Sequence, residues 1–219
     1  MAVSRESHTP SGQDHAIIGS EPLVLSRIVE PGINLAILER EVHPALRAFC
    51  EQTLTPSGLF AHELVIQPEE ELAATLPESI TSLPGAEAFL DDLSHINELW
   101  HDLFSPDRSG LRLRVLNQAM CPRFNVDRVI ARLIVSYGGV GTEWLPETAT
   151  NRSLLGRPLS DPKQDPLANT EQIQAIPPYA IALLKGEAWP GNEGRGIAHR
   201  SPPIEPPQRR ALLTMDILA

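Results

Sequence analysis

Residues 121–127 read Cys-Pro-Arg-Phe-Asn-Val-Asp, and residues 196–202 read Gly-Ile-Ala-His-Arg-Ser-Pro. Each stretch lies beside a strand-like run and carries side chains that bind metal ions. Residues i and i+2 of an extended chain point to the same side, so Asn125 and Asp127 are predicted to share one face. His199 comes much later in the chain and can be delivered by a strand that closes a barrel. The two stretches together predict one site built from distant segments.

Asp127 and His199 are the predicted metal ligands, with Asn125 in the third position. Carboxylate and imidazole groups bind first-row divalent ions well, whereas a neutral amide oxygen is a much weaker donor. Cys121 is an alternative ligand, and a thiolate there would favour zinc. His199 could also be an ordinary hydrogen-bonded histidine of the core.

Arginines crowd the chain around the first stretch, and a further pair opens the last predicted strand. Arg209 and Arg210 come ten and eleven residues after His199, where a guanidinium could bind a carboxylate. The predicted carboxylate ligand could instead pair with Arg128 or Arg132. The candidates for substrate binding are Arg195, Arg200, Glu143 and Trp189. The tryptophan among them could equally belong to the hydrophobic core.

The bulk composition indicates a soluble globular protein with one main domain. The chain has 219 residues, of which 42% are hydrophobic and 21% are charged. No apolar run is long enough to cross a bilayer, and the first twenty residues lack the apolar core of a secretory signal. Cys50 and Cys121 are too few for a disulfide framework, so we expect two thiols and a cytoplasmic protein.

The net charge of −10 argues against nucleic-acid and anionic-membrane partners, because both require a basic face. The arginines near the first stretch nevertheless predict a locally positive pocket that suits a small anion such as a carboxylate. Whether the substrate is a small molecule or a protein stays open, as does the oligomeric state.

The hydrophobic pattern changes from helical to strand-like near residue 106. The strongest helix spans 84–104, where apolar residues recur at three and four positions. Leu111, Leu113 and Val115 then alternate with Arg112 and Arg114, as in a strand with one buried face. Further helices are predicted at 43–54 and 68–76, and strands at 33–38, 64–66, 111–116, 129–137, 179–184 and 210–218. We therefore expect a disordered tail at 1–20, a mostly helical part at 21–106 with one or two strands, and a β-barrel domain at 107–219 with a long loop at 146–178.

The order Asp127, His199 and a following arginine resembles the 2-oxoglutarate and Fe(II)-dependent oxygenase superfamily over about the C-terminal half of the chain. That resemblance implies an α+β protein with a C-terminal double-stranded β-helix, a jelly-roll or cupin-like barrel. The N-terminal helices would pack on its sheet. It also implies Fe(II) and 2-oxoglutarate as cofactors, with Arg210 or Arg209 at the far carboxylate of the 2-oxo acid.

Longer blocks resemble DUF1826, a bacterial family of unknown function. They are residues 121–127, residues 141–145 (Gly-Thr-Glu-Trp-Leu) and the run from Lys185 to Pro202, which contains Trp189-Pro190-Gly191-Asn192-Glu193. The resemblance covers nearly the whole chain beyond the tail and implies a histidine at position 125, where this chain carries asparagine.

The sequence thus predicts a non-haem Fe(II)/2-oxoglutarate oxygenase-like protein of unknown substrate. If it is an enzyme, it is a dioxygenase-like oxidoreductase, weakened or inactive because Asn125 replaces the first histidine ligand. One alternative is a non-catalytic small-anion-binding or regulatory protein on the same barrel. The other is a zinc-handling protein.

Overall fold

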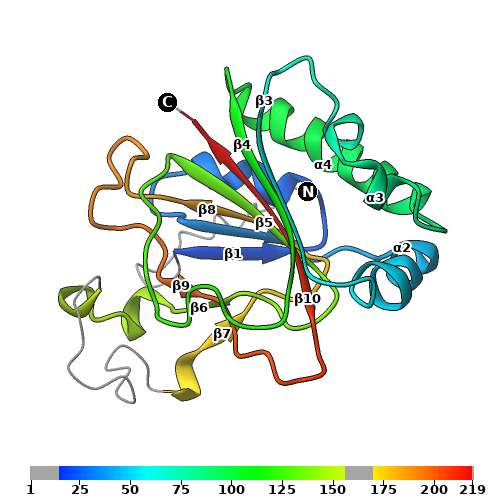
Figure 1. Ribbon diagram of the computed structural model, residues 1–219. Coiled ribbons are helices and arrows are strands. Elements are labelled where there is room, and N and C mark those ends of the chain that lie inside the picture. Colours follow the sequence, from blue (N-terminus) through cyan, green and yellow to red (C-terminus); the bar gives the residue numbers. More distant parts are fainter. Residues whose placement is uncertain (1–14, 156–169, 219) are drawn as a thin grey trace, which may run out of the picture.

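Two facing β-sheets and a set of helices make up the computed structural model, which describes residues 15–155 and 170–218. The large sheet has seven strands in the order β1-β2-β8-β5-β10-β4-β3, and the small sheet has three in the order β7-β6-β9 (Figure 1). The strands are β1 Ala16–Gly19, β2 Leu35–Leu38, β3 Phe60–Ile66, β4 Ser109–Leu116, β5 Ala131–Tyr137, β6 Glu143–Trp144, β7 Gln174–Ala175, β8 Ile181–Lys185, β9 His199–Arg200 and β10 Arg210–Ile217.

The last strand, β10, holds the centre of the large sheet together. It pairs antiparallel with β4 on one side and with β5 on the other, over almost its whole length. All other neighbouring strands of this sheet are also antiparallel except β1 and β2, which run parallel. Strands from the two ends and the middle of the sequence are therefore locked into one continuous sheet.

The helices lie mostly on one side of the large sheet, opposite the small sheet (Figure 1). They are α1 Leu23–Ser26, α2 Pro44–Phe49, α3 Glu78–Thr81 and α4 Glu87–Phe104, with the π-helical turn η2 at Cys50–Leu54. Short 3-10 segments are η1 Arg27–Val29, η3 Leu72–Thr75, η4 Glu147–Ala149, η5 Arg152–Leu154 and η6 Thr170–Gln172.

The main core lies between α4 and the large sheet. Phe89, Leu93, Ile96 and Trp100 of α4 are fully buried, and Trp100 donates a hydrogen bond from Nε1 to Ser109 Oγ at 2.8 Å. The sheet supplies alternate residues of each strand, such as Leu111, Leu113 and Val115 of β4, to this core. Because side chains alternate along a strand, the intervening residues face the small sheet. One face of the large sheet is thus committed to the core, and the other is available for a site.

The predicted elements are largely confirmed, with four differences. The 43–54 helix divides into α2 and the π-helical η2, and the 68–76 helix shrinks to the single 3-10 turn η3. The expected tail does not extend to residues 16–19, because these apolar residues pair with β2 as β1; residues 1–14 lie outside the described part. The expected boundary near 106 falls inside one sheet, which takes β1, β2 and β3 from the first part.

The long loop expected at 146–178 is described at 146–155 and 170–178, where it contains short 3-10 segments and β7. Its middle, residues 156–169, lies outside the described residues. Among the helices that the structure describes, none has the length and apolar character that crossing a membrane requires.

A buried ion pair fastens α4 to the sheet. Asp92 of α4 accepts a hydrogen bond from Arg40 Nη2 at 2.9 Å and one from the Tyr137 hydroxyl at 2.6 Å. Burial and the Asp92 carboxylate beside it raise the pKa of Tyr137, so its hydroxyl keeps its proton and donates. This carboxylate joins three segments that are distant in sequence.

We predict that Asp92→Ala destabilises the protein by about 3 kcal/mol, because it leaves a largely buried guanidinium and a buried hydroxyl unpaired. The measurement is the free energy of unfolding in urea. Asp91→Ala, the exposed neighbour on the same helix, is the matched control and should leave the unfolding midpoint unchanged. Equal effects of the two substitutions would contradict a specific role for the Asp92 network.

Candidate metal and anion site

A cavity of about 190 Å³ lies between the large sheet and the small sheet. Its volume equals the share of about six water molecules in the liquid, which is room for a small organic acid. The residues that line it include Cys121, Asn125, Asp127, Arg132, Ile134, Thr142, His199, Arg200, Ser201, Arg210, Leu212 and Thr214. Residues 121–127 and residues 196–202 therefore both contribute side chains to one pocket.

The two-residue period of the strands places the polar side chains in this cavity. In β5 the residues Leu133 and Val135 enter the core, while Arg132 and Ile134 line the cavity. In β10 the residues Leu213 and Met215 enter the core, while Arg210, Leu212 and Thr214 line the cavity. The charged face of the sheet is thus the direct consequence of alternation in strands whose other face is apolar.

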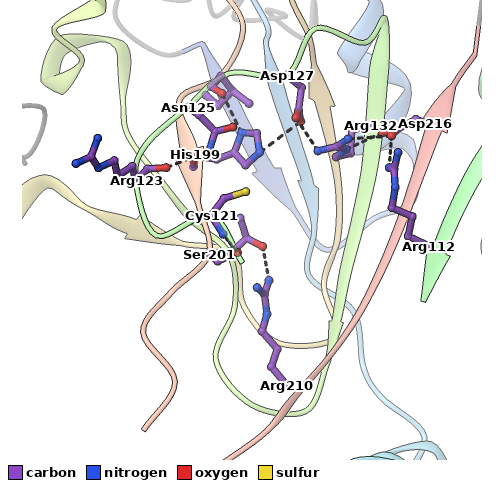
Figure 2. A network of polar contacts seen from close by, with 12 residues as sticks. Arg112, Cys121, Arg123, Asn125, Asp127, Arg132, His199, Ser201, Arg210 and Asp216 are labelled. Atoms are coloured by element: carbon purple, nitrogen blue, oxygen red, sulfur yellow. Dashed lines mark hydrogen bonds and ion pairs between the residues drawn. The ribbon is translucent and has the colours of Figure 1, made fainter. Parts of the chain in front are cut away.

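A backbone pairing brings the first predicted ligands together. Asn125 and His199 form an isolated antiparallel bridge, with Asn125 N donating to His199 O at 3.0 Å and His199 N donating to Asn125 O at 2.9 Å. Asp127 lies two residues beyond the bridge, and its carboxylate turns back toward the imidazole (Figure 2). The convergence depends on main-chain hydrogen bonds and not on the identity of residue 125.

His199 and Asp127 present one donor atom each to a common point. The imidazole Nδ1 lies 3.1 Å from the Ile197 carbonyl, which can only accept, so Nδ1 carries the proton and, in the neutral imidazole, Nε2 offers a lone pair. That Nε2 lies 3.3 Å from Asp127 Oδ2. Two ligands about 2.1 Å from one ion, at right angles, are about 3.0 Å apart, so this pair fits a shared divalent ion.

The environment of Asp127 Oδ2 supports that interpretation. This oxygen is buried and accepts no hydrogen bond from any residue that the structure describes. Leaving a buried carboxylate oxygen without a partner costs free energy, and a bound cation would remove that cost. The orphaned oxygen therefore fits a metal ligand better than a purely structural carboxylate.

The third position is weak. Asn125 Nδ2 donates to the carbonyls of Arg123 at 3.0 Å and His199 at 3.3 Å, so only its amide oxygen remains as a donor to a metal. Cys121 lines the same cavity, but within residues 15–155 and 170–218 no three His, Cys, Asp or Glu side chains group as metal ligands. The donors fit a divalent ion held by two strong ligands and, at most, one weak amide.

At another wall of the cavity, Arg210 is a buried cation that has no carboxylate partner among the described residues. It is 1% exposed, and its guanidinium donates to Ser136 Oγ at 2.9 Å and to the Thr142 hydroxyl. No carboxylate of the described chain forms an ion pair with it, and burial lowers its pKa to about 10. It remains protonated at neutral pH, so the cavity contains a positive charge that an anion would neutralise.

The chain around Thr142 is arranged by a close backbone approach. A Cβ on Gly141 would lie 1.6 Å from the Ile176 carbonyl oxygen, so only glycine fits there. Ile176 N in turn donates to Thr142 O at 2.9 Å. These contacts fix the start of the small sheet and direct the Thr142 hydroxyl at the guanidinium.

The other candidate residues lie in different places. Arg209 turns away from the cavity and donates to the carbonyls of Thr55 and Pro56, both at 3.0 Å. Arg200 lines the cavity, where its guanidinium pairs with Glu143 at 2.5 Å and lies over the Phe124 ring.

Two further candidates lie outside the cavity. Arg195 is exposed, and its carbonyl accepts from Asn34 and Arg152. Trp189 packs against the main core, with Phe104 and Lys185 against its ring. Neither side chain lines the cavity that contains Asp127 and His199.

Sequence reasoning did not select Ser136, Thr142 or Asp216 for the site. It treated Arg132 as one of the arginines of a positive pocket and as an alternative partner of Asp127. The structure confirms that ion pair, with Arg132 Nη1 2.6 Å from Asp127 Oδ1. Ser136 alternates with the apolar residues of β5, and this alternation could have placed it on the cavity face. A hydroxyl on a strand has many ordinary roles, however, so the pattern alone does not indicate a site. Thr142 carried no comparable signal.

Comparison with known proteins gives a family and a fold. Residues 19–216 match the model of the family described as Protein of unknown function (DUF1826). No curated protein matches the chain. The dioxygenase for auxin oxidation from rice is similar in structure, with a TM-score of 0.53 and 14% identity over 93% of this chain and 82% of that one.

Dioxygenase for auxin oxidation 1 from Arabidopsis thaliana, solved as a binary complex with 2-oxoglutarate, also has a TM-score of 0.53. It is 11% identical to this protein, and the likeness covers 93% of this chain and 92% of that one. Identities this low show a shared fold alone. The family match, which spans all but the ends of the sequence, shows that the chain belongs to the DUF1826 family.

Proposed function

We propose that this protein is an oxygenase-like 2-oxo acid-binding protein whose two facing sheets form a double-stranded β-helix of the jelly-roll kind. Arg210 binds the far carboxylate of a 2-oxo acid such as 2-oxoglutarate, and Asp127 with His199 holds Fe(II). Asn125, in the place of a first histidine, makes the metal site weak. The substrate that would be oxidised is not part of the proposal.

One observation carries the proposal: a buried, unpaired guanidinium shares a small cavity with an orphaned carboxylate oxygen and an imidazole lone pair. A buried cation without a counter-charge destabilises a fold, so its presence calls for a ligand that repays the cost. A 2-oxo dicarboxylic acid such as 2-oxoglutarate has the required form, with its far carboxylate for Arg210 and its 2-oxo acid end for the metal.

Each residue then has a definite task. The hydroxyls of Ser136 and Thr142 hold the guanidinium of Arg210 in one orientation, so its remaining N–H groups are directed at the anion. Ile134 and Leu212 supply an apolar wall that excludes water and strengthens the charge interaction. Bound Fe(II) would supply the chemistry with dioxygen that no side chain can provide.

The amide at position 125 favours a second candidate function, a non-catalytic anion-binding protein. The Asn125 side chain is occupied with two main-chain carbonyls, and the anion site at Arg210 does not depend on it. Both candidate functions include binding of the anion, but only the oxygenase-like function includes binding of a metal ion. They are separated by the metal dependence of binding.

We predict that 2-oxoglutarate binds the wild-type protein and that Arg210→Met weakens binding at least a hundredfold, because the charge for the far carboxylate is lost. Isothermal titration calorimetry with and without Mn²⁺ measures the 2-oxoglutarate affinity of both proteins. Binding should stay constant from pH 6 to pH 8.5 and fall as the pH rises through about 10, where Arg210 loses its proton.

Arg209→Met is the matched control, because the adjacent guanidinium contacts carbonyls outside the cavity. It should leave 2-oxoglutarate affinity unchanged. Thermal unfolding of Arg210→Met should show no large loss of stability, since methionine removes an uncompensated buried charge. Equal binding by the wild-type protein and Arg210→Met would refute the anion site.

We predict that Asn125→His raises Fe(II) affinity at least tenfold, because an imidazole replaces a weak amide ligand. Anaerobic titration with Fe(II) measures it. Adding Asp127→Asn to Asn125→His should remove the gain. An unchanged affinity in Asn125→His would favour the non-catalytic candidate.

A further inference from the structure

The two oxygens of the Asp127 carboxylate have different surroundings. Oδ1 accepts a hydrogen bond from Arg132 Nη1 at 2.6 Å, whereas Oδ2 lies 3.3 Å from His199 Nε2 without a hydrogen-bond donor among the described residues. An aspartate side chain can rotate about two bonds, and a hydrogen bond to one oxygen determines where the other points. Figure 2 shows the Asp127 carboxylate between Arg132 and His199.

Arg132 is itself held in place by the sheet. Its Nε lies 2.6 Å from Asp216 Oδ1 and its Nη2 lies 2.8 Å from Asp216 Oδ2, a two-point contact that fixes the plane of the guanidinium. Arg132 of β5 and Asp216 of β10 are directly opposite each other in the strand register. Asp216 is 1% exposed, so the pair is part of the rigid sheet.

We infer that Arg132, clamped by Asp216, is the positioning residue that turns Asp127 Oδ2 toward His199 Nε2. The inference rests on the proposed function, in which Asp127 and His199 hold a divalent ion. Arg132 lines the cavity, but its proposed role requires no contact with the ion or the 2-oxo acid. It acts through the carboxylate, by making Asp127 a one-oxygen ligand of fixed direction.

The charges permit this role. A guanidinium beside a metal ligand repels a dication, and an isolated arginine here would weaken the site. The negative charge of Asp216, which is buried against Arg132, offsets that repulsion. Arg132 can therefore keep its hydrogen bond to Asp127 without placing a full positive charge beside the ion. The carboxylates on both sides of Arg132 also raise its pKa above the ordinary value despite its burial, so the donor stays protonated.

The same network provides a matched control. Arg112 Nη1 lies 2.5 Å from Asp216 Oδ2, and in the described chain its other ion-pair partner is Glu63. Arg112 thus shares the partner and the charge of Arg132 but lacks the contact with Asp127. A substitution at Arg112 changes the charge around Asp216 and leaves the orientation of Asp127 alone.

The test compares Mn²⁺ and Co²⁺ affinity in the wild-type protein, Arg132→Met, Arg132→Lys and Arg112→Met, by calorimetry in the absence of 2-oxo acid. We expect a loss of tenfold or more in Arg132→Met, because groups that orient metal ligands contribute about 10–100-fold to metal affinity. Arg132→Lys should recover part of the loss, and Arg112→Met should stay within about threefold of the wild-type protein.

The visible absorption of bound Co²⁺ gives a readout that general destabilisation would not change. Its intensity should differ between Arg132→Met and the wild-type protein at saturating Co²⁺, and not between Arg112→Met and the wild-type protein. If Arg132→Met does not fold, the double variant Arg132→Met with Asp216→Asn replaces it, since it also removes the buried Asp216 charge that the single variant leaves with Arg112 alone. The same loss of affinity is expected there.

The possible outcomes distinguish a failure of the proposed metal site from a failure of the positioning role of Arg132. A wild-type protein that binds neither ion overturns the metal part of the proposed function and this inference with it. A wild-type protein that binds both ions, with equal or tighter binding by Arg132→Met, overturns the positioning role alone. Tighter binding would mean that Arg132 acts as a repelling charge.

Discussion

The antiparallel register of β4, β5 and β10 is the constraint on which the rest of the structure depends. Each of these strands sends one set of alternate residues into the core under α4 and the other set into the cavity. Because the period is two, a slip of one residue would bury the arginines and expose the leucines. The apolar face of the large sheet therefore determines the position of the charged groups that this sheet contributes to the site. Arg132 lies opposite Asp216 for this reason, and Arg210 faces the hydroxyl of Ser136.

The charges of the site divide into neutralised pairs and one remaining cation. Asp216 and Asp127 share Arg132, and Glu143 neutralises Arg200. Arg210 alone combines near-complete burial with hydroxyl partners only, within the residues that the structure describes. A lowered pKa shows that its surroundings disfavour the charged form, so this position reduces the stability of the protein. Such a residue is best explained by a ligand, whereas the paired arginines are explained by the fold.

Much of the fold could be predicted from sequence, but less of the site could. The long helix and the central strands have clear periods, and Asp127 and His199 were selected because their spacing suggested convergence. The short strands β6, β7 and β9 have two residues each, too few for any period to appear. Arg209 and Arg210 look equivalent as adjacent arginines, yet neighbouring strand residues point to opposite faces, and only the register decides which one enters the cavity. Trp189 shows the same limit, because an aromatic side chain suits a core and a pocket wall equally well.

The structure also explains how this chain can carry asparagine at position 125 without losing the site. The bridge between Asn125 and His199 uses main-chain atoms, which any residue supplies. The orientation of Asp127 comes from Arg132, and the anion site comes from β5, β10 and the Gly141 turn. None of these contacts passes through the side chain at 125. A change there is therefore compatible with the same backbone, the same orientation of Asp127 and the same surroundings of Arg210. The proposed metal ligands and the proposed anion site share one cavity but rest on separate sets of contacts, so a substitution that affects one need not affect the other.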